Sequence, residues 1–454
     1  MYSGNFKAVI LTLTLIVSGT AYGAGNNLLD EYIRLGLENN LALKQKRENY
    51  RMSLELLNEA RGMFYPSLSF NMRYSVARGG RVIEFPVGDL LNPVYSTLNM
   101  LTGTLDFNDI DNELFYFLRP REQETKLRLV QPVIYPGIWY NKRIREHEKE
   151  LGYIDIGIYR RSLVAEIKTA YFNYLKSIKV EQVLDKTILL LEENVRVNES
   201  LAANDMVTHD YIYRSRAELA KADQQLADAA GKRKTAAAWF NFLLNRPFDD
   251  EIVVSEVSGT DYLLTGYNED RFDVVDREEL DKTNRMVILA GDYVRLKKSS
   301  YYPRLTAVIE YGFQGTSYSF GRDDDFVLAS IVLSWPLFEG FQNNSGVRQA
   351  KIRRNMTELM HMEVQERLNL EIINAWYELE AAHKAIDAAS AQLRSAREAF
   401  RITERRFSRG NAPLVEFIDA RTNMTNAEIN LVISRYDFYI SHAEYEKAAA
   451  LYKF

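Results

Sequence analysis

Two carboxylates in the C-terminal part of the chain have residue types and a spacing that could do chemistry. Glu416 and Asp419 are three residues apart, which places both side chains on one face of a helix, one turn apart. If several copies of the chain met there, these carboxylates would form a narrow ring that attracts cations. Acidic residues also stabilise the first turn of a helix without any further role, so both interpretations stay open.

The two carboxylates directly follow a predicted turn between long helices. Residues 409–413 read Arg-Gly-Asn-Ala-Pro, and glycine and proline are typical of a helix end followed by a new start. A similar turn is expected at 203–208, with Asp205 and Asp210 as its acidic residues, but Tyr211 stands where Glu416 stands in the second turn. The residues expected at the two tips are Asn204, Asp205, Val207, Gly410, Asn411 and Pro413.

A very long helix is predicted to hold the second turn. From Val347 to Arg409 the sequence contains no glycine and no proline. Apolar or small residues recur there at alternating steps of three and four, which is the heptad pattern of a coiled coil. They are Leu368, Ile372, Ala375, Leu379, Ala382, Ile386, Ala389, Leu393, Ala396, Phe400, Thr403 and Phe407.

Four segments alternate apolar and polar residues and therefore predict β-strands. They lie at about 67–78, 124–132, 304–314 and 326–335. In the first, Phe70 and Ser69 point to opposite sides, and in the third Ile309 and Thr306 do so. Strands of about ten residues with a period of two are typical of transmembrane β-structure, although a soluble sandwich shows the same alternation. The prolines expected at the strand–helix junctions, where they stop strand pairing, are Pro66, Pro132, Pro303 and Pro336.

The order of elements occurs twice, which indicates an internal duplication. Tyr65-Pro66-Ser67-Leu68 is echoed by Tyr302-Pro303-Arg304-Leu305, and Gln131-Pro132 by Trp335-Pro336. Each repeat is expected to begin with a helix, at about 28–64 and at about 276–301. The predicted boundaries are 24–245 for the first repeat, 246–275 for a linker and 276–454 for the second repeat.

The N-terminal residues 1–23 read as a secretory signal peptide. Lys7 supplies a positive charge, residues 8–17 form a short apolar run, and Ala21 and Gly23 flank a small-residue cleavage site. No later segment has about 18 uninterrupted apolar residues, so any membrane crossing is expected from the strands.

Four strands cannot close a barrel by themselves. An open sheet leaves backbone groups unpaired at both edges, and lipid offers them no partner. Three copies of the chain would supply twelve strands. The predicted fold class is therefore an α+β membrane protein: a trimeric 12-stranded β-barrel with four strands per protomer, continued by a long α-helical coiled-coil barrel, with two internal structural repeats.

Composition argues against several other classes of protein. A formal net charge of -5 over 454 residues gives no electrostatic reason to bind nucleic acid. The absence of cysteine excludes disulfides and cysteine nucleophiles, and the five histidines show no metal-ligand spacing. No phosphate-binding loop, nucleophile elbow or dinucleotide motif is present. We expect no enzyme activity, no cofactor and no metal site.

The arrangement resembles the outer-membrane efflux protein family, the TolC-like exit ducts. The segments that resemble it are Leu41 to Tyr65 ending in Tyr65-Pro66-Ser67-Leu68-Ser69, Leu333–Gly340, Gly410, and Glu416-Phe417-Ile418-Asp419-Ala420-Arg421. Each motif is weak alone, but their order and duplication are specific, and the resemblance covers nearly the whole mature chain. The gating contacts of the family do not map onto this sequence, because Phe407 and Ala412 occupy the corresponding positions.

The resemblance implies a homotrimer in the lipid of the outer membrane of a Gram-negative bacterium, with a periplasmic helical extension. It implies the exit duct of a tripartite efflux or type I secretion system, which passively conducts substrates from a periplasmic adaptor (membrane fusion) protein and an inner-membrane pump. The carboxylates of Glu416 and Asp419 would then line the closed periplasmic end. The alternative is a secreted periplasmic coiled-coil adaptor or scaffold, which would not need four alternating strands.

The segment 79–123 departs from the family pattern. It joins the first pair of strands and is much longer than the corresponding loop at 315–325. We expect it to be extracellular, either as a cover over the mouth of the barrel or as a ligand-recognition loop.

Overall fold

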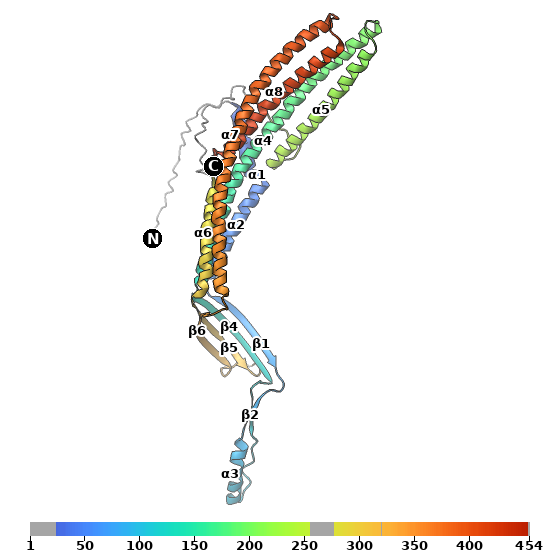
Figure 1. Ribbon diagram of the computed structural model, residues 1–454. Coiled ribbons are helices and arrows are strands. Elements are labelled where there is room, and N and C mark those ends of the chain that lie inside the picture. Colours follow the sequence, from blue (N-terminus) through green and yellow to red (C-terminus); the bar gives the residue numbers. More distant parts are fainter. Residues whose placement is uncertain (1–23, 255–276, 319, 453–454) are drawn as a thin grey trace, which may run out of the picture. The chain divides into compact units, whose positions relative to one another are not determined.

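The computed structural model describes residues 24–254, 277–318 and 320–452 (Figure 1). The predicted signal peptide and most of the predicted linker lie outside these residues. The described residues form two compact units, each built from separate stretches of the chain. One takes residues up to 48, 153–282 and from 362 onwards, and the other takes 49–152 and 283–361. These units divide the chain differently from the predicted repeats, whose boundaries stay a prediction.

Long helices make up most of the chain. They are α1 (Ala24–Asn39), α2 (Leu41–Gly62), α4 (Pro136–Ala203), α5 (Asp210–Leu243), α6 (Glu278–Lys298), α7 (Gln342–Ser408) and α8 (Leu414–Ala448). The 67 residues of α7 include the whole predicted heptad seam. Leu368, Ile372, Leu379 and Leu393 of that seam are buried, so the predicted coiled-coil face is confirmed.

The first predicted helix is two helices, which corrects the expectation of one helix at 28–64. The break lies at Asn40, whose Oδ1 accepts a hydrogen bond of 3.0 Å from the backbone N–H of Leu43 and so caps the start of α2. Its Nδ2 donates to the carbonyl oxygen of Leu243 at 2.9 Å. Asn40 is buried, and both ends of its amide are used to fix the break.

The helices of the first unit pack around an aromatic core. Tyr171 and Phe240 are almost fully buried, and Tyr32 meets the ring of Phe240 edge-on at 5.1 Å. Leu163 and Ile167, which precede Tyr171 on α4, belong to the same core. Burial of such side chains is the main source of stability for a bundle of helices.

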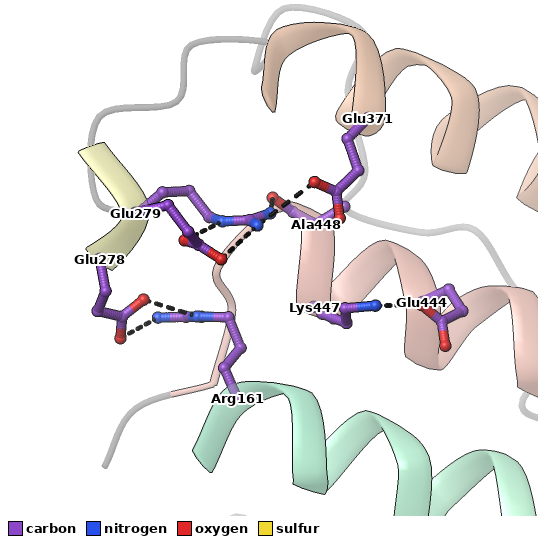
Figure 2. A network of polar contacts seen from close by, with 8 residues as sticks. Arg161, Glu278, Glu279, Glu371, Glu444, Lys447 and Ala448 are labelled. Carbon is purple, nitrogen blue, oxygen red and sulfur yellow. Dashed lines mark hydrogen bonds and ion pairs between the residues drawn. The ribbon is translucent and has the colours of Figure 1, made fainter. Parts of the chain in front are cut away.

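A cluster of charged residues joins the start of α6 to the end of α8 in the same unit (Figure 2). Arg161 donates two hydrogen bonds to Glu278, at 2.9 and 2.7 Å. Arg277 lies beside it, is 5% exposed, and pairs with Glu279 and Glu371.

The second unit contains a four-stranded antiparallel sheet in the order β1-β4-β5-β6 (Figure 1). The strands are β1 (Ser67–Val76), β4 (Arg121–Ile134), β5 (Arg304–Gly315) and β6 (Asp325–Ser334). Beyond β1 the chain forms β2 (Val82–Phe85), α3 (Val87–Thr102) and β3 (Glu113–Tyr116) before it returns through β4. The strands β1 and β6 each pair on one side only within the described chain, so both edges of the sheet are open.

The helices of the second unit enclose one buried carboxylate. Asp292 of α6 is fully buried, and two arginines and a histidine surround it. Arg295 pairs with its Oδ1 at 2.8 Å, and Arg143 and His147 of α4 approach its Oδ2 at 3.2 and 3.3 Å. A buried carboxylate needs such partners because desolvation disfavours its charge.

Among the described residues, no helix has a stretch long and apolar enough to cross a membrane.

Candidate functional site: two helical tips and an inverted sheet

The two helical tips share one backbone geometry. At the end of α4, Asp205 has a φ of 54°, and the N–H of Met206 donates to the carbonyl of Leu201 at 2.9 Å. At the end of α7, Gly410 has a φ of 70°, and the N–H of Asn411 donates to the carbonyl of Arg406 at 2.8 Å. Both are left-handed helix caps of the Schellman type.

The helices that return from the tips end in the same way. Asn245 follows α5 with a φ of 54°, and Ala450 follows α8 with a φ of 57°. Asp205 and Gly410 are 205 residues apart, and so are Asn245 and Ala450. This common spacing supports the predicted duplication, because a repeated fold needs equivalent ends.

Glu416 lies at the second tip as predicted, but its carboxylate has a cationic partner. Arg406 Nη1 lies 3.3 Å from Glu416 Oε2, and Arg406 Nη2 donates to the carbonyl oxygen of Asn411 at 3.1 Å. Phe407 stacks on Phe417 at 4.7 Å beside this pair. Arg406 thus ties the end of α7 to the start of α8 and gives one of the two predicted carboxylates an ion-pair partner.

Asp419 is exposed, and in the described part of the chain no cation lies within ion-pair distance of it. Two residues further on, Arg421 is only 4% exposed. Its Nε and Nη1 have no hydrogen-bond partner among the described residues. Burial lowers the pKa of Arg421, and the charge of Glu218 opposes that shift. Glu416 and Asp419 look alike in the sequence but differ in the structure. Glu416 pairs with Arg406, and Asp419 has no cation within ion-pair distance in the described part of the chain.

The first tip has no equivalent of this arrangement. Asp210 accepts a hydrogen bond from Thr208 and pairs with Arg214 at 3.4 Å. The predicted tip residues are mostly exposed, and Val207 is half-buried. The exposed ones are Asn204, Asp205, Gly410, Asn411 and Pro413.

The four predicted junction prolines occupy different positions in the structure. Pro66 and Pro303 directly precede β1 and β5. Pro336 lies two residues beyond the end of β6. Pro132 lies inside β4, which continues to Ile134, and the pairing with β5 shifts register between these two residues. A proline lacks the N–H of a regular ladder, so an irregularity at that point is expected.

The sheet is inverted with respect to a soluble protein. The register places Leu68, Leu129, Ile309 and Ala329 opposite one another across the four strands, so the predicted apolar sides form one continuous face. That face is open: the side chain of Ile309 is 47% exposed, whereas its neighbour Glu310 on the other face is 8% exposed. A large exposed apolar face marks a surface that meets lipid or another protein.

The polar face contains a network of alternating charges. Lys126 Nζ lies 2.7 Å from Glu124 Oε1 and 3.0 Å from Glu310 Oε2. Arg128 pairs with Glu310 at 3.3 Å, and Arg73 pairs with Glu124 at 3.3 Å. Alternation alone predicted a polar face but not these partners, because the pairs depend on the register between strands.

Gly312 makes room for this network. It lies directly opposite Lys126 in the ladder. A Cβ at Gly312 would approach the carbonyl oxygen of Thr125 to 2.4 Å and the Cβ of Lys126 to 2.6 Å. The close approach of the two strands at this point therefore requires glycine.

No metal centre is formed by the described residues, since nowhere do three or more His, Cys, Asp or Glu side chains gather as a metal ion would need.

Comparisons with known proteins identify a family and relatives that match this chain. Residues 277–450 match the family model described as "Outer membrane efflux protein". The chain is 22% identical to the outer membrane protein TolC of Escherichia coli (strain K12), over 97% of this chain and 86% of that protein.

Solved structures show a similar fold. The Campylobacter jejuni CmeC outer membrane channel superposes with a TM-score of 0.76 and 15% identity, over 98% of this chain and 94% of that one. The open state of the Neisseria gonorrhoeae MtrE outer membrane channel gives a TM-score of 0.70 and 17% identity, over 93% and 88%.

These findings confirm the resemblance to the outer-membrane efflux proteins, the α+β fold with long helices, the outer-membrane location and the role of an outer-membrane exit duct. The alternative of a secreted coiled-coil adaptor is not favoured. The matched family is one of efflux channels and not of enzymes.

Proposed function

We propose that this TolC-like exit duct works as a homotrimer, in which the sheets of three protomers join into a twelve-stranded barrel in the outer membrane. The observation that supports this most directly is the inverted sheet: Ile309 is exposed on the apolar face while Glu310 is shielded on the polar face. Such a sheet is stable with lipid outside and water inside.

The open edges of the sheet determine how the protomers would join. Within the four-stranded sheet, β1 and β6 each lack a second neighbour in the described chain. In lipid their free N–H and C=O groups would each cost several kcal/mol, roughly, so β1 of one protomer must pair with β6 of the next. Cyclic symmetry then closes the ring without leaving an edge.

The assembly can be tested on the full chain in detergent. We expect native mass measurement to give three protomers, and gel migration to change on heating, as closed barrels are resistant to unfolding. A folded monomer of defined mass that is stable in the same detergent would contradict the trimer.

We further propose that a periplasmic adaptor protein binds the two helical tips and that an inner-membrane pump supplies the substrate. Support comes from the exposed polar tip residues, such as Asn204 and Asn411, whose surfaces a partner could contact. The duct itself would then be passive, with no catalytic step, no cofactor and no nucleic acid. A photo-crosslinking group placed at Asn411 should capture the adaptor in cells, whereas one at Ser317, in the short loop after β5, should not.

The carboxylate of Asp419 is proposed to set the ion selectivity of the periplasmic opening. Around a threefold axis, three copies of this unpaired carboxylate would meet in a confined space, where a low effective dielectric strengthens their field. Glu416 contributes less, because Arg406 already balances its charge at 3.3 Å.

Conductance of purified trimers in planar bilayers can separate the two residues. We expect cation-selective channels that trivalent cations block from the periplasmic side. Asp419→Asn should remove most of that block, and Glu416→Gln should remove little, with Asp210→Asn at the other tip as a control. Equal effects of the first two substitutions would mean that the pairing with Arg406 does not matter, and no effect of either would place the filter elsewhere.

A further inference from the structure

The segment between β1 and β4 is an arm with its own secondary structure and internal hydrogen bonds. It contains the hairpin of β2 and β3 and the helix α3 between them. Asn92 exchanges two hydrogen bonds with the backbone of Ile110, at 3.0 and 2.9 Å, and Asn99 does the same with Phe107, at 2.8 and 3.1 Å. These contacts occupy one face of α3 and hold the returning chain against it.

The start of α3 is fixed to the same returning chain. Asn112 Oδ1 accepts hydrogen bonds from the N–H groups of Gly88 and Asp89 at 3.1 and 3.2 Å. A Cβ at Gly88 would lie 2.3 Å from the carbonyl oxygen of Ile110, so the two segments touch along their backbones. The orientation of α3 within the arm is therefore determined.

A second face of α3 is apolar and only partly covered: Leu91, Val94 and Leu101 are exposed, whereas Val87 and Leu98 are half-buried. Its residues recur at alternating steps of four and three and form a seam: Val87, Leu91, Val94, Leu98 and Leu101. Val94 is 52% exposed and Leu101 is 77% exposed. This spacing is typical of an amphipathic helix that packs its apolar face against other helices.

A lipid surface fits this seam poorly. Helices that lie on a membrane carry Lys or Arg on their polar face. The 16 residues of α3 contain neither, and Asp89 is their one charged residue. Contact with a membrane surface also requires only an apolar face, because lipid chains do not need side chains at a regular repeat.

The seam composition favours more than two helices. In heptad terms Leu91 and Leu98 occupy a positions, and Val87, Val94 and Leu101 occupy d positions. Leucine at a with isoleucine at d shifts parallel coiled coils towards trimers and tetramers, and Val87 and Val94 share the β-branched shape of isoleucine. The arm also leaves the sheet directly after Val76, the last residue of an edge strand that needs a neighbouring copy.

We propose that the α3 seams of three protomers pack together as a short parallel coiled coil at the end of the barrel opposite the helices. The occupant of each seam is a second copy of this chain. This inference rests on the proposed trimer, and it assigns the extra segment to a self-made external cover instead of a ligand-recognition loop.

Cysteine crosslinking tests the proposal directly, since the chain has no cysteine of its own. Val94→Cys places a thiol in the seam, and the matched control Ser96→Cys places one on the far side of the same helix, where it is also exposed. In intact trimers, mild oxidation or a short bis-maleimide should link Val94→Cys into covalent dimers and leave Ser96→Cys as single chains. Adding Leu101→Asp to Val94→Cys should reduce that crosslink strongly.

The outcomes separate this proposal from the trimer itself, because native mass is measured on the same samples. Trimers in which Val94→Cys reacts with a monofunctional maleimide but does not crosslink would overturn the cover and leave the duct intact. Trimers in which this thiol is protected yet uncrosslinked would show that lipid or another protein covers the seam, which also overturns it. Samples without trimers would refute both.

Discussion

Arg277 donates a hydrogen bond of 2.9 Å from Nη1 to the carbonyl oxygen of Ala448, the last residue of α8. The last carbonyls of a helix have no partner within the helix and carry partial negative charge, so a guanidinium is a suitable cap. The same Arg277 pairs with Glu279 at 2.8 Å and with Glu371 of α7 at 3.4 Å. One side chain thus links the beginning of α6 to two other helices.

Removal of this guanidinium should destabilise the first unit. Arg277→Ala would leave Glu279 and the end of α8 without their partner in a mostly buried site. Loss of one member of a buried pair costs about 3–5 kcal/mol. Thermal unfolding followed by helical circular dichroism should show the loss. Lys447→Ala removes a more exposed pair, with Glu444 at 2.9 Å, and should cost less than about 1 kcal/mol. Similar losses for both variants would contradict the role assigned to Arg277.

The faces of the sheet can be tested with two substitutions in β5. Ile309→Arg would put a charge on the apolar face, opposite Leu129 and Ala329. A lipid-facing arginine near the midplane costs about 2–4 kcal/mol, so the yield of heat-modifiable trimer should fall. Thr306→Arg, on the opposite face of the same strand, should be tolerated. The assignment of faces is wrong if Thr306→Arg is the more damaging change.

The sequence predicted the regular features of the fold because they depend on periodicity. The seam from Leu368 to Leu393 is buried, and the strands begin and end within a few residues of the predicted positions. The break at Asn40 is not evident from the sequence, because neither glycine nor proline marks it and one of the two hydrogen bonds that hold Asn40 goes to the distant Leu243. Local patterns do not contain such contacts.

The candidate site was predicted only in part. The spacing of Glu416 and Asp419 placed both at a tip, but the pairing of Glu416 with Arg406 depends on how the turn folds back. The charges around Glu310 could be listed from the sequence but not paired, since the strand with Lys126 is far away in the chain. The sequence signal for the four helix caps is their constant separation of 205 residues between the two repeats.

The close approach of β4 and β5 at Gly312 gives a third prediction. Gly312→Ala would place a Cβ 2.4 Å from the carbonyl oxygen of Thr125, which belongs to the ladder and cannot move away. Overpacking of this kind costs about 1–3 kcal/mol, and here it would also separate β4 from β5. The fraction of chain that forms trimers in the outer membrane should drop. Gly321→Ala is the matched control, because nothing lies within 4 Å of its added Cβ. Normal assembly of Gly312→Ala would show that the strands can separate without cost.

The last prediction concerns pH and His442 of α8. This imidazole lies 3.6 Å from Glu446, which also binds Lys168 at 2.8 Å. Burial lowers the pKa of His442, Glu446 opposes the shift, and Lys168 adds to it. In the unfolded chain a histidine titrates near 6.5, roughly, so the unfolded state binds the proton first as the pH falls.

It follows that acidification through this range should destabilise the folded protein, because the proton favours the unfolded chain until the lower folded pKa is reached. The melting temperature of the wild type should therefore drop between pH 7.5 and pH 5.5, roughly the range in which an unfolded histidine gains its proton. His442→Gln cannot titrate and should show a smaller drop over the same range. His209→Gln, at the exposed first tip, should keep the wild-type pH dependence. If His442→Gln and the wild type lose stability equally on acidification, another group is responsible and the burial of His442 has no influence on the pH response.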